Sequence, residues 1–262
     1  MVKRGIILII ILILAGLGIF LYDRLPPEEI EDPLLRKIKE RGELIIGTDA
    51  TYPPMEDVDE EGNIFGMDMD IAKEVAFDLG VEPEFRNVIW EEIFGVVREG
   101  GVDMIISSIT ITAERTKIMD FSNPYFNAGQ VIVIRADEKE IIRGVEDLQG
   151  RVLGVQTETT SEEAAKELTD PSLVKGYENS PLAGEDLLRG EIDAVILDYP
   201  AAVGMVAENK DFQIVGVPFT QEFYGIAIQK GQKMLLSQIN KTIRRLKTEE
   251  VLKALEEKWL GQ

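Results

Sequence analysis

The sequence of 262 residues contains neither cysteine nor histidine. Without cysteine there is no disulfide framework, no zinc–thiolate site and no lipid-modified cysteine to act as an anchor. Without histidine the chain lacks the commonest metal ligand and the usual acid–base side chain near neutral pH. We therefore expect no cofactor, no metal site and no catalytic residues.

Basic residues are few beside acidic ones: 28 Lys and Arg stand against 48 Asp and Glu, for a formal net charge of −20 at pH 7. This balance argues against nucleic acid as a partner, because contacts to phosphates need positive charge. We interpret the acidity as a solubility feature or a halophile- or thermophile-type surface rather than a trap for ligand. Hydrophobic residues make up 45% of the chain, enough to bury two small cores.

One long hydrophobic run is present, from Gly5 to Tyr22, and Lys3 and Arg4 precede it. A helix over this run would be ~27 Å long, close to the ~30 Å hydrocarbon core of a bilayer. No small-residue cleavage signal follows, and the positive residues favour a cytoplasmic start. We predict a cytoplasmic N-terminus at 1–4, a transmembrane signal anchor or uncleaved signal at 5–22, and a spacer at 23–36.

A strand–helix pattern occurs twice in the remaining chain. Apolar runs and helical spacing predict strands at 44–47, 82–88 and 102–106, with helices at 68–79 and 91–99. The same order returns as strands at 151–155, 172–175 and 192–196, with helices at 161–168 and 181–189. Two βαβαβ units imply an α/β fold with two parallel sheets, each covered by helices.

The two units match most closely at one junction. Gly100–Ile106 and Gly190–Ile196 each run from glycine through an aspartate into an apolar strand. Asp103 and Asp193 come before their strands, on the side away from the carboxyl ends. We therefore interpret both aspartates as structural.

Polar residues follow the predicted strands. Ligands of such sheets bind outside the carboxyl ends of the strands. The residues at these ends are Thr48-Asp49, Ser107-Ser108, Gln156-Thr157 and Leu197-Asp198. One half-site in each unit predicts a cleft between two lobes.

Arg115 stands seven residues beyond Ser108, after several hydroxyl side chains. A guanidinium grips a planar carboxylate with two parallel hydrogen bonds, and hydroxyls can satisfy its remaining lone pairs. A free amino acid would need such a cation and a nearby anion, for which Asp198 is the candidate. Each charge-assisted bond is worth about 1.5–3 kcal/mol when buried. The alternative is a polar loop whose arginine makes a surface ion pair.

Four segments carry a resemblance: Gly47–Glu56, Gly66–Ala72, Thr110–Arg115 and Asp120–Tyr125. With them, the chain from about 44 to 259 resembles the solute-binding component of ABC importers for polar amino acids. This is family 3 of the bacterial extracellular solute-binding proteins, of the histidine-, glutamine- and arginine-binding type. The resemblance implies a two-lobed periplasmic-binding-protein fold of type II that closes on its ligand.

The resemblance also implies roles for individual residues. Arg115 would bind the carboxylate, helped by hydroxyls at Ser108 and Thr110, and Asp198 would bind the ammonium group. Lobe two would contribute from the segment Gln156–Thr160. The predicted ligand-binding residues are Asp49, Tyr52, Trp90, Ser107, Ser108, Thr110, Arg115, Gln156, Thr159, Thr160 and Asp198.

Asp49 is an acid near the presumed side-chain end of the ligand, and Tyr52 and Trp90 would form aromatic walls. Acid and aromatic faces together favour a ligand such as Arg, Lys or Gln. Each residue has a plainer interpretation. Asp49 could close an Asx-turn, Tyr52 and Trp90 could simply pack, and Asp198 could cap the next helix. The role of Glu56 stays open.

The lobe boundaries follow from changes in pattern. We predict lobe one at 37–134 and 221–262 and lobe two at 135–220, with crossings at 130–134 and near 217–220. A strand at 224–228 would rejoin the first sheet. An amphipathic helix over 232–259, broken near Thr248, would pack on lobe one; a coiled-coil partner is the alternative.

The leading hypothesis is a membrane-tethered substrate-binding subunit of an ABC transporter, with its lobes on the extracellular or periplasmic side. Its partners would be a free amino acid, an ABC permease and the bilayer through 5–22. An alternative is a cyclohexadienyl dehydratase-like enzyme, because Glu158 stands where the family usually has glycine and could act as a catalytic acid. A further alternative is the ligand-sensing domain of a receptor, which we expect would need a partner for output.

Overall fold

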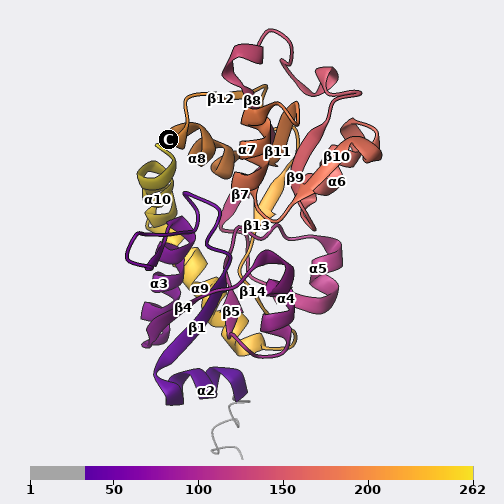
Figure 1. Cartoon of the computed structure of the whole chain (residues 1–262). Helices are drawn as coiled ribbons and strands as arrows, with labels where there is room; N and C mark the ends of the chain where they lie inside the picture. Colours follow the sequence, from indigo (N-terminus) through magenta and orange to yellow (C-terminus); the bar gives the residue numbers. More distant parts are fainter. Residues whose placement is uncertain (1–32, 262) are drawn as a thin grey trace, which may run out of the picture. The chain divides into compact units, whose positions relative to one another are not determined.

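The computed structural model describes residues 33–261, which form two five-stranded sheets with helices on both faces of each (Figure 1). The first sheet has the order β4 (Glu82–Asn87), β1 (Glu43–Thr48), β5 (Met104–Ile105), β14 (Ala227–Gln229) and β6 (Met119–Phe121). The second has the order β10 (Val174–Tyr177), β9 (Leu153–Gln156), β11 (Ala194–Asp198), β8 (Gln130–Arg135) and β12 (Phe212–Val215). We call the first sheet with its helices lobe one and the second with its helices lobe two.

The two sheets have the same arrangement, strand for strand. In each, the first three strands are parallel and the last two are antiparallel to their neighbours. The βαβαβ units are therefore confirmed, but the prediction of wholly parallel sheets was wrong. A βαβαβ pattern accounts for only three strands. In each sheet one further strand, β14 or β8, runs opposite to these three, and the edge strand beyond it, β6 or β12, runs opposite to that one.

A short two-stranded ribbon lies in the chain between the lobes. It pairs β7 (Phe126–Ala128) with antiparallel β13 (Glu222–Tyr224), and we call it the connecting ribbon. The sequence pattern placed 130–134 in lobe one, but β8 pairs with β11 and β12 in lobe two. That expectation was wrong because an apolar strand fits the interior of either sheet. We propose that the chain crosses between the lobes at the connecting ribbon.

Each sheet lies between two layers of helices, one on each face. Apolar side chains of α3 (Met67–Leu79), α9 (Lys233–Thr248) and α10 (Val251–Leu260) form the core on one face of the first sheet. The opposite face packs against α4 (Trp90–Arg98). In lobe two, α7 (Ser180–Arg189) and α8 (Tyr199–Glu208) cover one face and α6 (Thr160–Leu168) the other.

Helix ends follow the local sequence. Gly80 and Gly190 end α3 and α7 in the left-handed conformation that glycine adopts without a steric penalty. Thr159 and Asn179 cap α6 and α7, each accepting a backbone N–H bond through its side chain. The predicted break near Thr248 is confirmed by the separate helices α9 and α10.

The remaining elements are short. They are the helices α2 (Pro33–Arg41) and α5 (Ala113–Ile118), the strands β2 (Asp57–Val58) and β3 (Ile64–Phe65), and the 3-10 turns Ala136–Glu138, Val145–Asp147 and Pro171–Leu173. The last of these occupies the first half of the predicted strand at 172–175, so that strand begins two residues later than expected.

The two aspartates that precede β5 and β11 do the same structural work in both lobes. Asp103 accepts the Ile45 N–H at 2.8 Å, and Asp193 accepts the Val152 N–H at 2.8 Å. Their own N–H groups donate to the carbonyls of the same two residues at 2.8 Å. Both aspartates thus join neighbouring parallel strands away from the strand carboxyl ends, as predicted.

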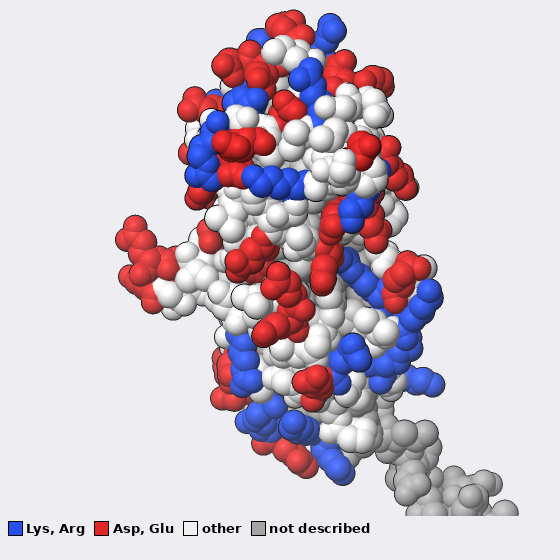
Figure 2. Space-filling model, turned by 45° about the vertical axis from the view of Figure 1, so that its right-hand side comes forward, with Lys and Arg blue, Asp and Glu red and all other residues white. Residues whose placement is uncertain are grey.

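Acidic side chains do not gather in one patch on the face shown in Figure 2, where they are interspersed with Lys and Arg. Some form networks: the Arg245 guanidinium lies within 3.3 Å of Glu74, Asp78 and Glu249. The predicted segments 1–4 and 5–22, and the spacer up to 32, lie outside the described residues. Within 33–261, no helix is long and apolar enough to cross a membrane.

Candidate ligand-binding site

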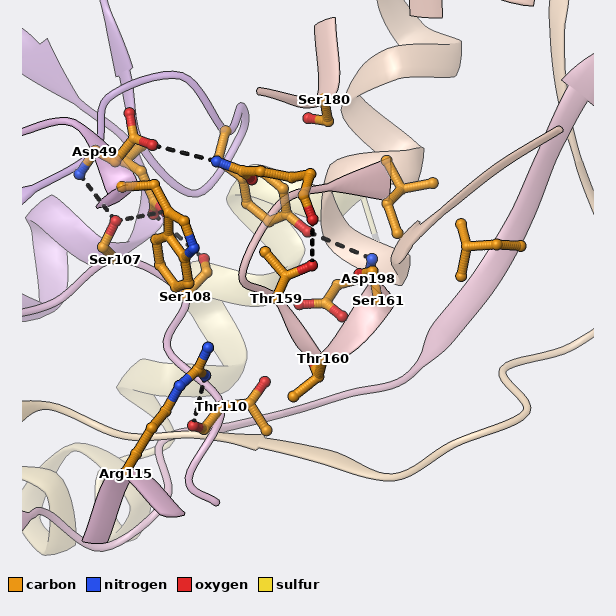
Figure 3. A pocket seen from close by; sticks show the side chains of 16 residues that line it. Asp49, Ser107, Ser108, Thr110, Arg115, Thr159, Thr160, Ser161, Ser180 and Asp198 are labelled. Carbon is orange, nitrogen blue, oxygen red and sulfur yellow. Dashed lines mark hydrogen bonds between the residues drawn. The ribbon is translucent and has the colours of Figure 1, made fainter. Parts of the chain in front are cut away.

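A cavity lies between the lobes at the carboxyl ends of the parallel strands, where the polar residues were predicted to meet (Figure 3). Every residue of the predicted ligand-binding set lines it. The lining residues are Asp49, Tyr52, Glu56, Trp90, Ser107, Ser108, Thr110, Arg115, Gln156, Thr159, Thr160, Ser161, Ser180, Ile196, Leu197 and Asp198. Their part in binding a ligand stays a prediction.

Lobe one contributes a buried network of short polar side chains that follow β1 and β5. Ser107 Oγ accepts the Asp49 N–H at 2.9 Å and donates to Glu56 Oε1 at 3.3 Å. Ser108 Oγ donates to Glu56 Oε2 at 3.3 Å. Ser108 has a φ of 51°, a left-handed conformation that aims its N–H at Asp68 Oδ2, 2.8 Å away. Both serines are thereby held in place by carboxyl groups behind them.

Glu56 and Asp68 form a buried acid pair beneath these serines. Burial raises the pKa of Glu56 well above its usual value, and the nearby Asp68 raises it further. Burial also raises the pKa of Asp68, to about 6, against hydrogen bonds from Ser108 and Tyr125 that lower it. Two adjacent carboxyls in a buried site cannot both ionise cheaply, so the upward shift of the pKa favours the neutral form of Glu56.

Asp49 has a different environment at the same end of the cavity. Its carboxylate accepts from Thr51 Oγ1 at 3.0 Å and from Gln156 Nε2 at 3.5 Å, the second across the two lobes. Burial raises its pKa, while these hydrogen bonds lower it. The Asx-turn alternative does not describe it, because its side chain bonds Thr51 and Gln156 while its own carbonyl accepts the Thr51 N–H.

Arg115 extends from α5 toward the cavity (Figure 3). Nη1 donates to the Thr110 carbonyl at 2.9 Å, and the guanidinium carbon lies 5.4 Å from the Trp90 ring and 5.0 Å from the Phe94 ring. Trp90 and Phe94 pack edge to face on α4. Burial lowers the pKa of Arg115, but an arginine stays charged under such a shift. The surface ion-pair alternative is wrong, because the group is partly buried against two aromatic rings.

Asp198 lies at the end of β11, where its carboxylate is held from two sides. Gln130 Nε2 donates to Oδ1 and the Tyr224 hydroxyl to Oδ2. Its N–H donates to the Tyr52 hydroxyl at 3.3 Å. The side chain makes no cap bond to α8, so the helix-cap alternative is wrong. Burial raises the pKa of Asp198 to about 7, with Glu222 adding to the shift and Tyr224 and Arg115 opposing it.

Lobe two faces Arg115 with backbone as well as side chains. The Glu158 carbonyl accepts from Trp90 Nε1 at 3.3 Å and from Arg115 Nη2 at 3.5 Å. Glu158 has a φ of 59°, and its own N–H is bound by Glu162 Oε2 at 2.7 Å. Its side chain is exposed and does not line the cavity. The position where the family resemblance expects glycine thus keeps a left-handed backbone.

Some contributors were missed by sequence reasoning. Gln130, at the start of apolar β8, is fully buried and bonds Asp198, Thr160 and Ser161. A glutamine opening an apolar strand was the available signal, because a buried amide needs partners. Tyr224 gave no signal beyond its aromatic type. Ser161 and Ser180, which also line the cavity, looked like ordinary residues at helix starts.

Comparison with known proteins assigns the chain to a family. The model of the bacterial extracellular solute-binding proteins, family 3, matches residues 44–262. The chain belongs to this family. The motifs in the sequence predicted this membership, and the prediction is confirmed.

Individual relatives of this solute-binding protein span nearly the same length. The L-cystine-binding protein TcyJ of Escherichia coli (strain K12) is 32% identical, with 88% of this chain and 87% of the relative covered. The ABC transporter glutamine-binding protein GlnH of Bacillus subtilis (strain 168) is 34% identical, with 90% and 87% covered.

Among solved structures, the P235GK mutant of ArgBP from T. maritima is similar, with a TM-score of 0.81 and 40% identity. The match covers 87% of this chain and all of that one. The two-lobed fold of type II, with a cleft between α/β lobes, is therefore confirmed for this solute-binding protein.

Proposed function

We propose that this solute-binding protein captures a free amino acid between its lobes and serves an ABC importer. The observation that carries the proposal is a cavity whose lining includes Arg115 of lobe one and Asp198 of lobe two. The two groups interact electrostatically, each shifting the pKa of the other toward its charged form. A zwitterion matches this arrangement, with its carboxylate at Arg115 and its ammonium group at Asp198.

The side-chain end of the cavity favours a cationic or amide ligand. When the zwitterion neutralises Arg115 and Asp198, the acids left in the lining are Asp49 and Glu56. Burial and the nearby Asp68 raise the pKa of Glu56 and favour its neutral form, so we propose that Asp49 supplies the remaining negative charge. A guanidinium or ammonium group would complement it, and an amide could donate a hydrogen bond to it. We therefore propose arginine, lysine or glutamine as the ligand, with Tyr52 and Trp90 along its side chain.

The segment at 5–22 would tether the lobes to the membrane, on the extracellular or periplasmic side. Its length and the basic residues before it support this role. A tether keeps the binding lobes near an ABC permease. Fractionation of cells tests it: the full chain should stay in the membrane pellet after alkaline carbonate extraction. A chain without 1–32 should be released, and release of the full chain would contradict the tether.

Calorimetric titration tests the ligand. Residues 33–262 form a compact unit of their own, suited to unfolding and refolding that removes any bound ligand. Each standard amino acid would be titrated into this fragment. We expect tight binding of arginine, lysine or glutamine and weak or no binding of glutamate and the aliphatic amino acids. Absence of binding for all of them would overturn the proposal.

The position of Glu158 counts against the dehydratase alternative. Its side chain is exposed and is not among the residues that line the cavity, so delivery of a proton to a ligand held there would need a rearrangement. Turnover of a cyclic acid such as prephenate or arogenate, lost in Glu158→Gln, would revive the enzyme hypothesis.

A further inference from the structure

Gly204 of α8 meets the other lobe at very close range. A Cβ placed on Gly204 would lie 2.3 Å from the Pro53 carbonyl oxygen, 2.8 Å from its carbonyl carbon and 3.1 Å from Pro54 Cδ. These three nearest atoms all belong to lobe one, whereas α8 belongs to lobe two. Packing within lobe two therefore does not explain why the side chain is missing here.

The lobe-one partner of this contact is firmly held. Met67 N–H donates to the Pro54 carbonyl at 3.2 Å, and Asp68 N–H donates to the Met55 carbonyl at 3.0 Å. These bonds tie the loop to the start of α3. Gly66, which precedes Met67, also lies against the loop, and a Cβ there would be 2.1 Å from the Met55 oxygen. Because the residues that follow Pro53 are held in this way, space for a Cβ at position 204 is gained more readily by separating the lobes than by moving the loop.

The contact lies outside the ligand cavity but is connected to it at both ends. Gly204 does not line the cavity. In lobe two, Asp198 immediately precedes α8. In lobe one, Tyr52 immediately precedes Pro53 and accepts the Asp198 N–H. Moving α8 away from the loop would therefore pull Asp198 away from Tyr52 and open the cavity on this side. Figure 1 shows α8 beside α10 of lobe one, on the same side of the molecule.

We propose that Gly204 is a closure residue, whose missing side chain lets α8 reach the Pro53 carbonyl and the two lobes close fully. This inference rests on the proposed function, because closure matters for binding only if the cavity holds a ligand contacted by both lobes. A side chain at 204 would lower the population of the closed form. The affinity measured for any ligand would fall by the same factor.

Gly204→Ala in the full chain, in detergent micelles, tests the proposal. Alanine favours helix formation over glycine, so the variant should fold and melt no lower than the unsubstituted protein. Gly95→Ala is the matched control: Gly95 also lies within a helix, α4, and a Cβ there would meet no atom within 4 Å. We expect affinity for the amino acid to fall about tenfold or more in Gly204→Ala and to stay unchanged in Gly95→Ala.

Distance measurements separate closure from direct binding. The chain has no cysteine, so spin labels can be placed specifically at Glu82→Cys in lobe one and Glu191→Cys in lobe two, both at exposed positions. At saturating ligand, the shortest distance between the two spin labels reports the most closed form of the protein. This distance should be longer in Gly204→Ala than in Gly95→Ala. Equal affinities and equal shortest distances in the two variants would overturn the proposal.

Failure of the proposed function would look different. If the unsubstituted protein bound no amino acid, the receptor proposal would fall. The distances in the ligand-free proteins would still test Gly204, because the steric limit to closure does not depend on the ligand. A shortest distance that is the same with glycine and alanine at 204 would then exclude the closure role.

Discussion

Lobe one and lobe two share a sheet order and the same aspartate bridge between parallel strands, yet they offer the cavity different surfaces. In lobe one the hydroxyl residues Ser107, Ser108 and Thr110 are 3%, 7% and 6% exposed, and carboxyl groups fix the two serines from behind. In lobe two Gln156, Thr159 and Thr160 are only half-buried. A repeated scaffold thus carries a half-site of buried hydroxyl residues in lobe one, and in lobe two a half-site that combines the buried Asp198 with half-buried polar residues.

The two lobes also divide the charges of the site. Lobe one supplies the cation Arg115 and the acid Asp49, and lobe two supplies Asp198, which Gln130 and Tyr224 hold from beta strands. Arg115 already donates to lobe two through the Glu158 carbonyl. We infer that the proposed ligand first meets the rigid half-site of lobe one and that lobe two then adds the ammonium partner.

Removing the cation from lobe one should have the largest effect on affinity. We expect Arg115→Ala to weaken amino-acid binding about 100-fold, because a buried charge-assisted pair is worth about 3 kcal/mol at most. Calorimetry on the refolded fragment 33–262 measures it. Arg86→Ala is the control, since Arg86 is an exposed lobe-one arginine paired with Glu84. Near-native affinity in Arg115→Ala would exclude Arg115 as the group that binds the ligand's carboxylate.

The anion of lobe two should make binding depend on pH. Because the pKa of Asp198 is about 7 in the ligand-free protein, the carboxylate that binds the ammonium group is lost as the pH falls below 7. Affinity should fall by about tenfold per pH unit toward pH 5. Asp198→Asn should bind weakly at every pH and lack this dependence; a variant that keeps the full dependence would show that another group causes it.

Asp198 should make the stability of the ligand-free protein depend on pH in the direction opposite to ligand affinity. Affinity falls as the pH falls, whereas the contribution of Asp198 to stability rises. Its pKa is higher in the folded state than the ordinary value of 3.8, so its contribution to stability is fully present below pH 3.8 and is lost as the pH rises through 7. The melting temperature of the ligand-free protein should therefore fall as the pH rises from about 4 to 7, and Asp198→Asn should remove this fall.

Asp49 should control ligand choice more than overall affinity. We expect Asp49→Asn to weaken arginine or lysine binding about tenfold and to leave glutamine within about threefold, because an amide can bond asparagine as well as aspartate. Competition titrations of the three amino acids measure the ratio. An equal loss for all three would place Asp49 in a structural role through Thr51 and Gln156.

The paired aspartates Asp103 and Asp193 should affect affinity least and stability clearly. Asparagine at either position keeps an acceptor for the strand N–H but loses a charge that faces an arginine. That arginine is Arg41 for the buried Asp103 and Arg151, 3.8 Å away, for the more exposed Asp193. We expect Asp103→Asn to lower the free energy of unfolding by about 1–3 kcal/mol and Asp193→Asn, which is less buried, by about 1 kcal/mol or less. Urea unfolding measures both, and a loss of ligand affinity without a loss of stability would contradict the structural role.

Most of the fold was predictable because short-range signals agreed with one another. Apolar strands, helical spacing and the glycines at 80 and 190 located the repeated units, and the strand ends located the cavity. The assignment of β8 failed because the run Val131–Ile134 is equally apolar whichever sheet it joins. The position of a strand in a sheet depends on its hydrogen-bond partners, and these are distant in sequence.

The sequence by itself determined the order of the repeated βαβαβ units, the family and most of the residues that line the cavity, because each follows from local pattern or from motifs. The tertiary structure decided what those residues do to one another. Gln130 and Tyr224 hold Asp198, burial and the nearby Asp68 raise the pKa of Glu56, and the Glu158 carbonyl accepts a hydrogen bond from Arg115. These outcomes depend on burial and on the distances between residues that are far apart in the chain. Only the tertiary fold sets those distances.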